Sequence, residues 1–195
     1  MYKRQEWLEN AYVGNFSLIG NHLLILVHDP YEENEERDDF GIYIVDVVTL
    51  EQVGGYAGDF RGCSCSEEGL LVVESDDGRR LNVYQLNERD ASMFPVRSIM
   101  RHDHRRIGGE PKGDILLVND SKVYISAWAT DPPFCTIDVY DTRNGSFLRS
   151  LCCPLDGQIW VPVRLVAGSK LLFCGFNSTA GRRHVRGTIK AYLLE

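Results

Sequence analysis

The sequence predicts an all-β fold built from about four antiparallel sheets of four strands each, all in one chain. The first observation is that neighbouring apolar runs recur as four pairs, and each pair is typical of a β-hairpin. The second is the length of the chain, since 195 residues with 44% apolar and 25% charged side chains are enough for a globular core. The paired runs are 23–29 with 41–49, 70–75 with 79–87, 122–128 with 135–143, and 170–176 with 187–195.

Each hairpin combines two kinds of strand. The first run of each pair is almost continuously apolar, which predicts a strand buried on both faces. The second run alternates β-branched or aromatic residues with polar ones, which predicts one face toward a core. The alternating positions fall in register across the four pairs: Ile42 and Ile44, Leu81 and Val83, Ile137 and Val139, Ile189 and Ala191.

Two further segments complete each four-stranded unit. An outer strand is expected after the second run in three of the units, at 49–57, 93–100 and 144–153, and the last of these opens with the turn signal Asn144-Gly145. A short first strand is expected before each hairpin, at 15–20, 60–66, near 105–113, and at 160–168. The third strands begin 38, 56 and 52 residues apart, close to the ~40–50 residues of propeller repeats.

This rhythm resembles WD-repeat-like β-propellers, and the resemblance covers residues 16–195. The family's Trp-Asp pair at the end of the third strand is matched only by Val45-Asp46 and Tyr140-Asp141. The other two units carry Tyr84-Gln85 and Tyr192-Leu193 there, and the Gly-His pair of the family is missing, so the blade rhythm carries the resemblance. A β-sandwich or another antiparallel barrel is the alternative fold.

The resemblance implies one repeat domain over 16–195, preceded by an N-terminal segment at 1–15. The last unit lacks an outer strand of its own, and residues 1–15 are a candidate for that strand. Two constructions stay open: a small ring closed within the chain, or half of a larger ring completed by a second copy or by another chain. A half-ring would expose two apolar blade faces.

The sequence predicts a soluble protein of the cytoplasm or nucleus. The first residues lack the unbroken apolar stretch of a signal peptide, and no run reaches the ~18 apolar residues of a membrane span. In a reducing compartment the six cysteines are expected to be free thiols. They are Cys63, Cys65, Cys135, Cys152, Cys153 and Cys174.

No catalytic, cofactor-binding or metal-binding motif is found, so we expect neither an enzyme nor a cofactor. The acidic stretch from Asp29 does not fit a calcium loop, because Asn34 and Phe40 stand where that loop needs Gly and Glu. The Cys63-Ser64-Cys65 run would bind zinc only with two more ligands, and core packing of both cysteines is the stronger prediction.

Charge is concentrated in three predicted loops. Residues 29–39 hold seven carboxylates and one arginine, a net of −6 out of the chain's −7. This loop joins the second and third strands of the first unit, while a basic loop holds the same place in the fourth unit and another precedes the third unit. The residues predicted to contact a partner are Glu32, Glu33, Glu35, Glu36, Asp38, Asp39, Arg105, Arg106, Arg182, Arg183 and Arg186.

These features favour a noncatalytic interaction scaffold, or a subunit of a multiprotein assembly, that binds protein partners through its charged loop face. A second copy or another chain is among the expected partners, and a membrane is not. An enzyme with a site at the central channel of the propeller is the alternative. Contact with RNA in a ribonucleoprotein is the lesser alternative, since the chain is acidic and its basic clusters lack interleaved aromatic residues.

Overall fold

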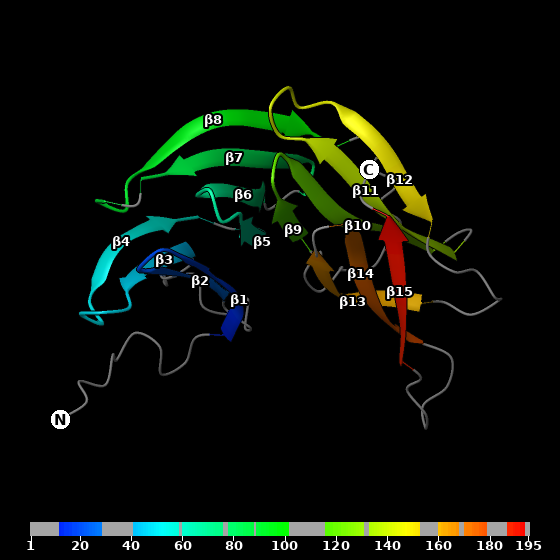
Figure 1. Ribbon diagram of the computed structural model, residues 1–195, viewed down its shortest axis with the longest axis horizontal. Helices are drawn as coiled ribbons and strands as arrows, with labels where there is room; N and C mark the ends of the chain where they lie inside the picture. The colour runs from blue at the N-terminus through cyan, green and yellow to red at the C-terminus, as the bar shows by residue number, and fades with distance from the viewer. Residues whose placement is uncertain are drawn as a thin grey trace. The chain divides into compact units, whose positions relative to one another are not determined.

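The computed structural model describes residues 12–28, 41–58, 60–75, 78–87, 89–101, 116–130, 133–152, 160–167, 170–178 and 187–193. Over these ranges the chain forms fifteen β-strands and no helix (Figure 1). It divides into two compact units, Met1–Ser98 and Ile99–Glu195. The all-β, propeller-like prediction is confirmed.

Two four-stranded sheets make up the first unit, and neighbouring strands follow one another along the chain in the orders β1-β2-β3-β4 and β5-β6-β7-β8. The first sheet contains β1 (Tyr12–Ile19), β2 (His22–His28), β3 (Gly41–Asp46) and β4 (Gln52–Ala57). The second contains β5 (Phe60–Cys65), β6 (Leu70–Ser75), β7 (Arg80–Leu86) and β8 (Met93–Met100).

The second unit repeats this arrangement. Its third sheet, in the order β12-β11-β10-β9, contains β9 (Leu116–Asn119), β10 (Lys122–Thr130), β11 (Pro133–Asp141) and β12 (Phe147–Cys152). The fourth sheet has three strands among the described residues: β13 (Trp160–Ala167), β14 (Leu171–Ser178) and β15 (Gly187–Leu193).

All four predicted hairpins are confirmed, because β2 pairs with β3, β6 with β7, β10 with β11 and β14 with β15, each antiparallel. The first strand of the third sheet lies later than predicted. It is β9, joined to β10 by the two-residue turn Asp120–Ser121, in which Asp120 has a φ of 50°. The stretch predicted for this strand, 105–113, is outside the described residues.

The N-terminal segment also differs from the prediction where it can be seen. Strand β1 begins at Tyr12 and pairs with β2 from Tyr12↔His28 onward, with a bulge between Val13 and Asn15. The first strand is therefore longer than the predicted 15–20. The candidate outer strand of the last sheet was the segment 1–15. Of this segment, residues 1–11 lie outside the described residues.

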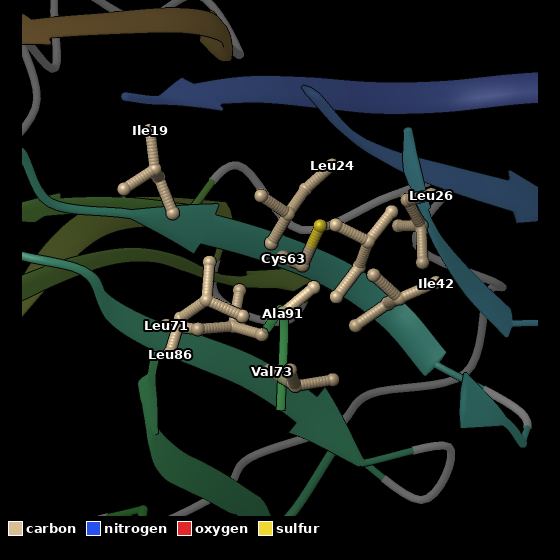
Figure 2. Packing of buried hydrophobic residues seen from close by; sticks show 10 residues of the cluster. Ile19, Leu24, Leu26, Ile42, Cys63, Leu71, Val73, Leu86 and Ala91 are labelled. Atoms are coloured by element: carbon tan, nitrogen blue, oxygen red, sulfur yellow. The ribbon is translucent and has the colours of Figure 1, made fainter. Parts of the chain in front are cut away.

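The core of the first unit lies between its two sheets. The first sheet contributes Ile19, Leu24, Leu26, Ile42 and Ile44, and the second contributes Cys63, Leu71, Val73, Leu86 and Ala91. Figure 2 shows these side chains pointing toward one another, with the Cys63 sulfur among them. Burial of so many aliphatic groups is what holds the two sheets face to face.

In the second unit an equivalent core lies between the third and fourth sheets. Its members are Tyr124, Ile137, Val139, Leu165, Leu172 and Cys174, with Leu117, Leu151, Ala167 and Tyr192 packed against them. A hydrogen bond from a side chain to the backbone joins the same two sheets: the Arg149 guanidinium donates to the Leu193 carbonyl oxygen at 3.2 Å.

A six-residue turn recurs after the third strand of the first three sheets. The turns are Asp46–Glu51, Asn87–Ser92 and Asp141–Ser146, each closed by a hydrogen bond of 2.9 Å between its end residues. The side-chain oxygen of the first residue accepts a hydrogen bond from the amide two residues later, at 2.8, 3.0 and 2.7 Å. The fifth residue has a positive φ: Leu50 60°, Ala91 57° and Gly145 77°. Asn and Asp favour such turns because their side chains satisfy local amides.

Candidate interaction surfaces

The predicted partner-binding residues fall in three connections between strands. Glu32, Glu33, Glu35, Glu36, Asp38 and Asp39 belong to the connection between β2 and β3, Arg105 and Arg106 to that between β8 and β9, and Arg182, Arg183 and Arg186 to that between β14 and β15. All of them lie outside the described residues. Their role in binding stays a prediction.

Two residues of the predicted basic cluster before the third unit are described: Arg97 is exposed on β8, and Arg101 has a structural role. Arg101 follows β8, is buried, and donates a hydrogen bond from its guanidinium to the Ser126 carbonyl oxygen at 3.1 Å. A buried guanidinium that is held by the backbone anchors its segment. Arg101 therefore fixes the start of the basic segment and does not offer its charge to a partner.

The third strands of the four sheets place equivalent residues on equivalent faces. The pairings that define the register are Leu24↔Ile44, Val72↔Val83, Tyr124↔Val139 and Phe173↔Ala191. Two residues earlier on the same face stand Ile42, Leu81, Ile137 and Ile189. In the first three sheets every one of these third-strand residues is at most 1% exposed, whereas Ile189 is 74% exposed and Ala191 is also exposed.

The predicted register is thus confirmed, but the equivalent third-strand residues of the fourth sheet are exposed and not buried. Strand β15 turns Tyr192 toward the core of the second unit and the alternate residues away from it. We call this other side the open face of the fourth sheet; its described members are Leu171, Ile189, Ala191 and Leu193. Leu193 is 67% exposed and Leu171 is half-buried.

The first sheet has an open face of its own, on the side away from the core of the first unit. It consists of Phe16, Leu18, Leu23, Ile25 and Tyr43. Phe16 is 68% and Leu18 is 62% exposed, and the other three are half-buried. A contiguous apolar face of this kind on a folded protein is typical of an interaction site.

The second sheet exposes apolar side chains at its edge. Phe94, Val96 and Met100 alternate along β8, are each more than half exposed, and form what we call the β8 row. Strand β8 is the terminal strand in the order of its sheet, so one of its sides has no neighbouring strand among the described residues. An exposed edge of this kind can accept an added strand.

The cysteines of β5 are core residues, as predicted. Cys63 is fully buried, Cys65 packs against the same core, and both are free thiols. Burial raises the pKa of Cys63 to about 12. Burial, with a smaller contribution from the neighbouring Cys63, raises the pKa of Cys65 to about 12 as well. Because the thiolate is the nucleophile and the metal ligand, neither thiol is activated for chemistry at neutral pH.

The two aspartates at the ends of third strands have lowered pKa values for structural reasons. Hydrogen bonds from the Thr49 and Val48 amides hold the pKa of Asp46 below its ordinary value. The Arg143 side chain does the same for Asp141 through hydrogen bonds of 3.2 and 2.7 Å. Both carboxylates therefore stabilise the turns that follow their strands. They are the two aspartates that the sequence analysis matched to the Asp of the Trp-Asp pair.

The described residues also bear on metals and membranes. Among them, no group of three or more His, Cys, Asp or Glu side chains lies close enough together to hold a metal ion. Nor does this part of the chain contain a helix long and apolar enough to cross a membrane.

Sequence reasoning anticipated two exposed blade faces for a half-ring but named none of their residues, and it did not find the β8 row. Ile189 and Ala191 carry the same pattern as their buried equivalents, so periodicity alone could not tell them apart. The repeated turn had a weak signal, an Asp or Asn at the end of three third strands, which the comparison with Trp-Asp pairs detected in only two of them.

No protein-family model matches the chain, and no curated protein matches it significantly in sequence. Solved structures do. Hydrazine synthase from Kuenenia stuttgartiensis is similar over 93% of this chain and 49% of its own, with a TM-score of 0.59 at 14% identity. The β-propeller domain of the Trilobed protease from Pyrococcus furiosus is similar over 96% and 55%, with a TM-score of 0.52 at 10% identity.

BamB from Moraxella catarrhalis is a third similar structure, over 83% of this chain and 39% of its own, with a TM-score of 0.52 at 8% identity. The chain therefore spans about half of each of these structures or less. At such identities the likeness shows the fold alone. The chain has a β-propeller-like fold, and the WD-repeat class stays a prediction.

Proposed function

We propose that the chain is a noncatalytic interaction subunit that binds a partner protein through the β8 row and the charged loops. The observation that carries the proposal is the exposure of Phe94, Val96 and Met100 along an edge strand. Large apolar side chains on an edge strand are an aggregation hazard unless a partner covers them. Their exposure supports a binding role for this edge.

The chemistry next to β8 suggests the kind of partner. The basic segment with Arg105 and Arg106 follows β8 in the sequence, and Arg101 anchors its start. An extended partner segment that pairs with β8 would meet apolar side chains first and positive charge beyond them. We therefore expect an extended peptide that is rich in apolar and acidic residues.

The thiols support a noncatalytic reading. Cys63 and Cys65 are protonated core groups at neutral pH, so the Cys-Ser-Cys run lacks the lowered pKa that an attacking thiol needs.

Selection of phage-displayed random peptides on the purified chain tests the proposal. The selected peptides should be enriched in apolar and acidic residues, and should lose binding to the Phe94→Asp and Val96→Asp variants. Val48→Asp is the matched control, because Val48 is equally apolar and 73% exposed but lies in the turn after β3. Failure to select any peptide, or peptides that bind the Phe94→Asp and wild-type chains equally, would contradict the proposal.

A further inference from the structure

Within each unit, two successive sheets pack by the same pair of faces. In the first unit, the third-strand face of the first sheet meets a face of the second sheet. In the second unit, the third-strand face of the third sheet meets the corresponding face of the fourth. The receiving faces are formed by Cys63, Leu71 and Val73 in one case, and by Leu165, Leu172 and Cys174 in the other.

The open face of the first sheet has the register of a receiving face. Phe16 pairs with Ile25 as Cys63 pairs with Val73, and Leu165 stands at the same position in the fourth sheet. Cys63 is fully buried and Leu165 is 7% exposed, whereas Phe16 is 68% exposed. The first sheet therefore carries a face with the register of a receiving face, on which Phe16 and Leu18 are exposed.

The open face of the fourth sheet has the complementary register. Ile189 and Ala191 stand where Ile42 and Ile44 of the first sheet pack against the second. Each chain thus carries one uncovered face of each kind, and the two kinds are those that pack together inside each unit.

At one equivalent position on each open face, side-chain size departs in opposite directions from the core of the first unit. Phe16 takes the place of the smaller Cys63, and Ala191 takes the place of the larger Ile44. A larger residue on one side matched by a smaller one on the other conserves the packed volume, which is the exchange that cores tolerate best. The open face of the first sheet is therefore suited to the fourth sheet of this same sequence.

Charge on the adjoining connections agrees with this match. The connection between β2 and β3 of the first sheet carries the acidic residues 32–39, and the equivalent connection between β14 and β15 of the fourth sheet carries three arginines. Sheets that pack in this way would carry connections of opposite net charge, which favours their association.

We infer that a second copy of this chain covers both open faces: the fourth sheet of each copy packs on the first sheet of the other. Two such contacts related by a two-fold axis form a closed pair in which both open faces of each copy are covered. The likeness to solved propellers fits this arrangement, since the chain spans 49% and 55% of two of them. The inference uses other residues than the β8 row and stands apart from the proposed peptide binding.

Sedimentation velocity over a range of concentrations tests the pair. The wild-type chain should reach twice its mass of 22.1 kDa and form no larger species. Phe16→Glu and Ile189→Glu should each shift the mass to that of a single chain at concentrations where the wild type is paired, because each puts a charge into both contacts. Val48→Glu, exposed and outside both faces, should leave the pair intact.

Three results would overturn the inference: a wild-type chain that stays single at every concentration, one that forms only species larger than the pair, or a pair whose mass neither substitution changes. A chain that pairs only with a different protein gives the first result. If circular dichroism shows that a variant is unfolded, Leu18→Glu or Leu193→Glu replaces it, because these residues are exposed on the same two faces. Peptide selection on the β8 row is unaffected by either outcome.

Discussion

Truncation of Ile44 tests the packing between the sheets of the first unit. Ile44 is fully buried, and its Cδ1 lies over Gly54, at 3.5 Å from where a Cβ at Gly54 would stand. Ile44→Ala removes three carbon atoms, which at about 0.8 kcal/mol each lose about 2.4 kcal/mol of transfer free energy. Gly54 has no side chain to fill the space, so a cavity term raises the expected loss of unfolding free energy to about 3–4 kcal/mol.

Urea denaturation at one protein concentration measures this loss. Ile44→Val should cost about 1 kcal/mol, since it removes only one methylene group. Val48→Ala, at an exposed apolar position of the following turn, should change the stability by less than about 0.5 kcal/mol. The packing described for the first unit would be refuted if Ile44→Ala destabilised the chain no more than Val48→Ala does.

Three other predictions concern the turns and the thiols. Asp46→Asn should keep its turn at neutral pH, as Asn87 does in the second sheet, and should flatten the loss of thermal stability between neutral pH and about pH 2. The sign follows because the folded-state pKa of Asp46 is lowered, so its contribution is present above its ordinary pKa and is lost as the pH falls through the folded value; an unchanged pH dependence would speak against this. Leu50→Gly should stabilise the chain by about 0.5 kcal/mol in urea denaturation, because glycine relieves the positive φ of an exposed residue at some cost in unfolded-state entropy, and a loss of stability would be the contrary result. Cys63 and Cys65 should react with a maleimide far more slowly in the native chain than after unfolding, as mass spectrometry of the labelled peptides would reveal; equal rates would contradict their burial and raised pKa.

The four hairpins could be predicted from the sequence because each one shows the complete pattern within a short stretch. A continuous apolar run followed by an alternating run at a short distance has few other solutions than a buried strand paired with a half-buried one. The sequence did not place β9 correctly. The apolar run Leu116–Val118 is separated from β10 by a short turn, and the positive φ of Asp120 in this turn has no clear sequence signal.

The residues of the candidate surfaces could not be identified from the sequence, for a different reason. Burial is decided by what packs on a face, and Ile189 has the same pattern as Ile42 and Ile137. Ile42 and Ile137 pack in the cores of their units, whereas Ile189 is 74% exposed. The charged loops were the conspicuous feature of the sequence, and their role in binding is still to be measured.

Hydroxyl-radical footprinting of the third-strand isoleucines measures the difference in exposure that defines the open face of the fourth sheet. Ile44, Ile137 and Ile189 have the same intrinsic reactivity, so their labelling compares exposure alone. In the Phe16→Glu variant, which should keep the chain single, the account predicts strong labelling of Ile189 and almost none of Ile44 and Ile137. Equal labelling of all three would contradict the claim that one repeated third-strand position is buried in the first and third sheets and exposed in the fourth.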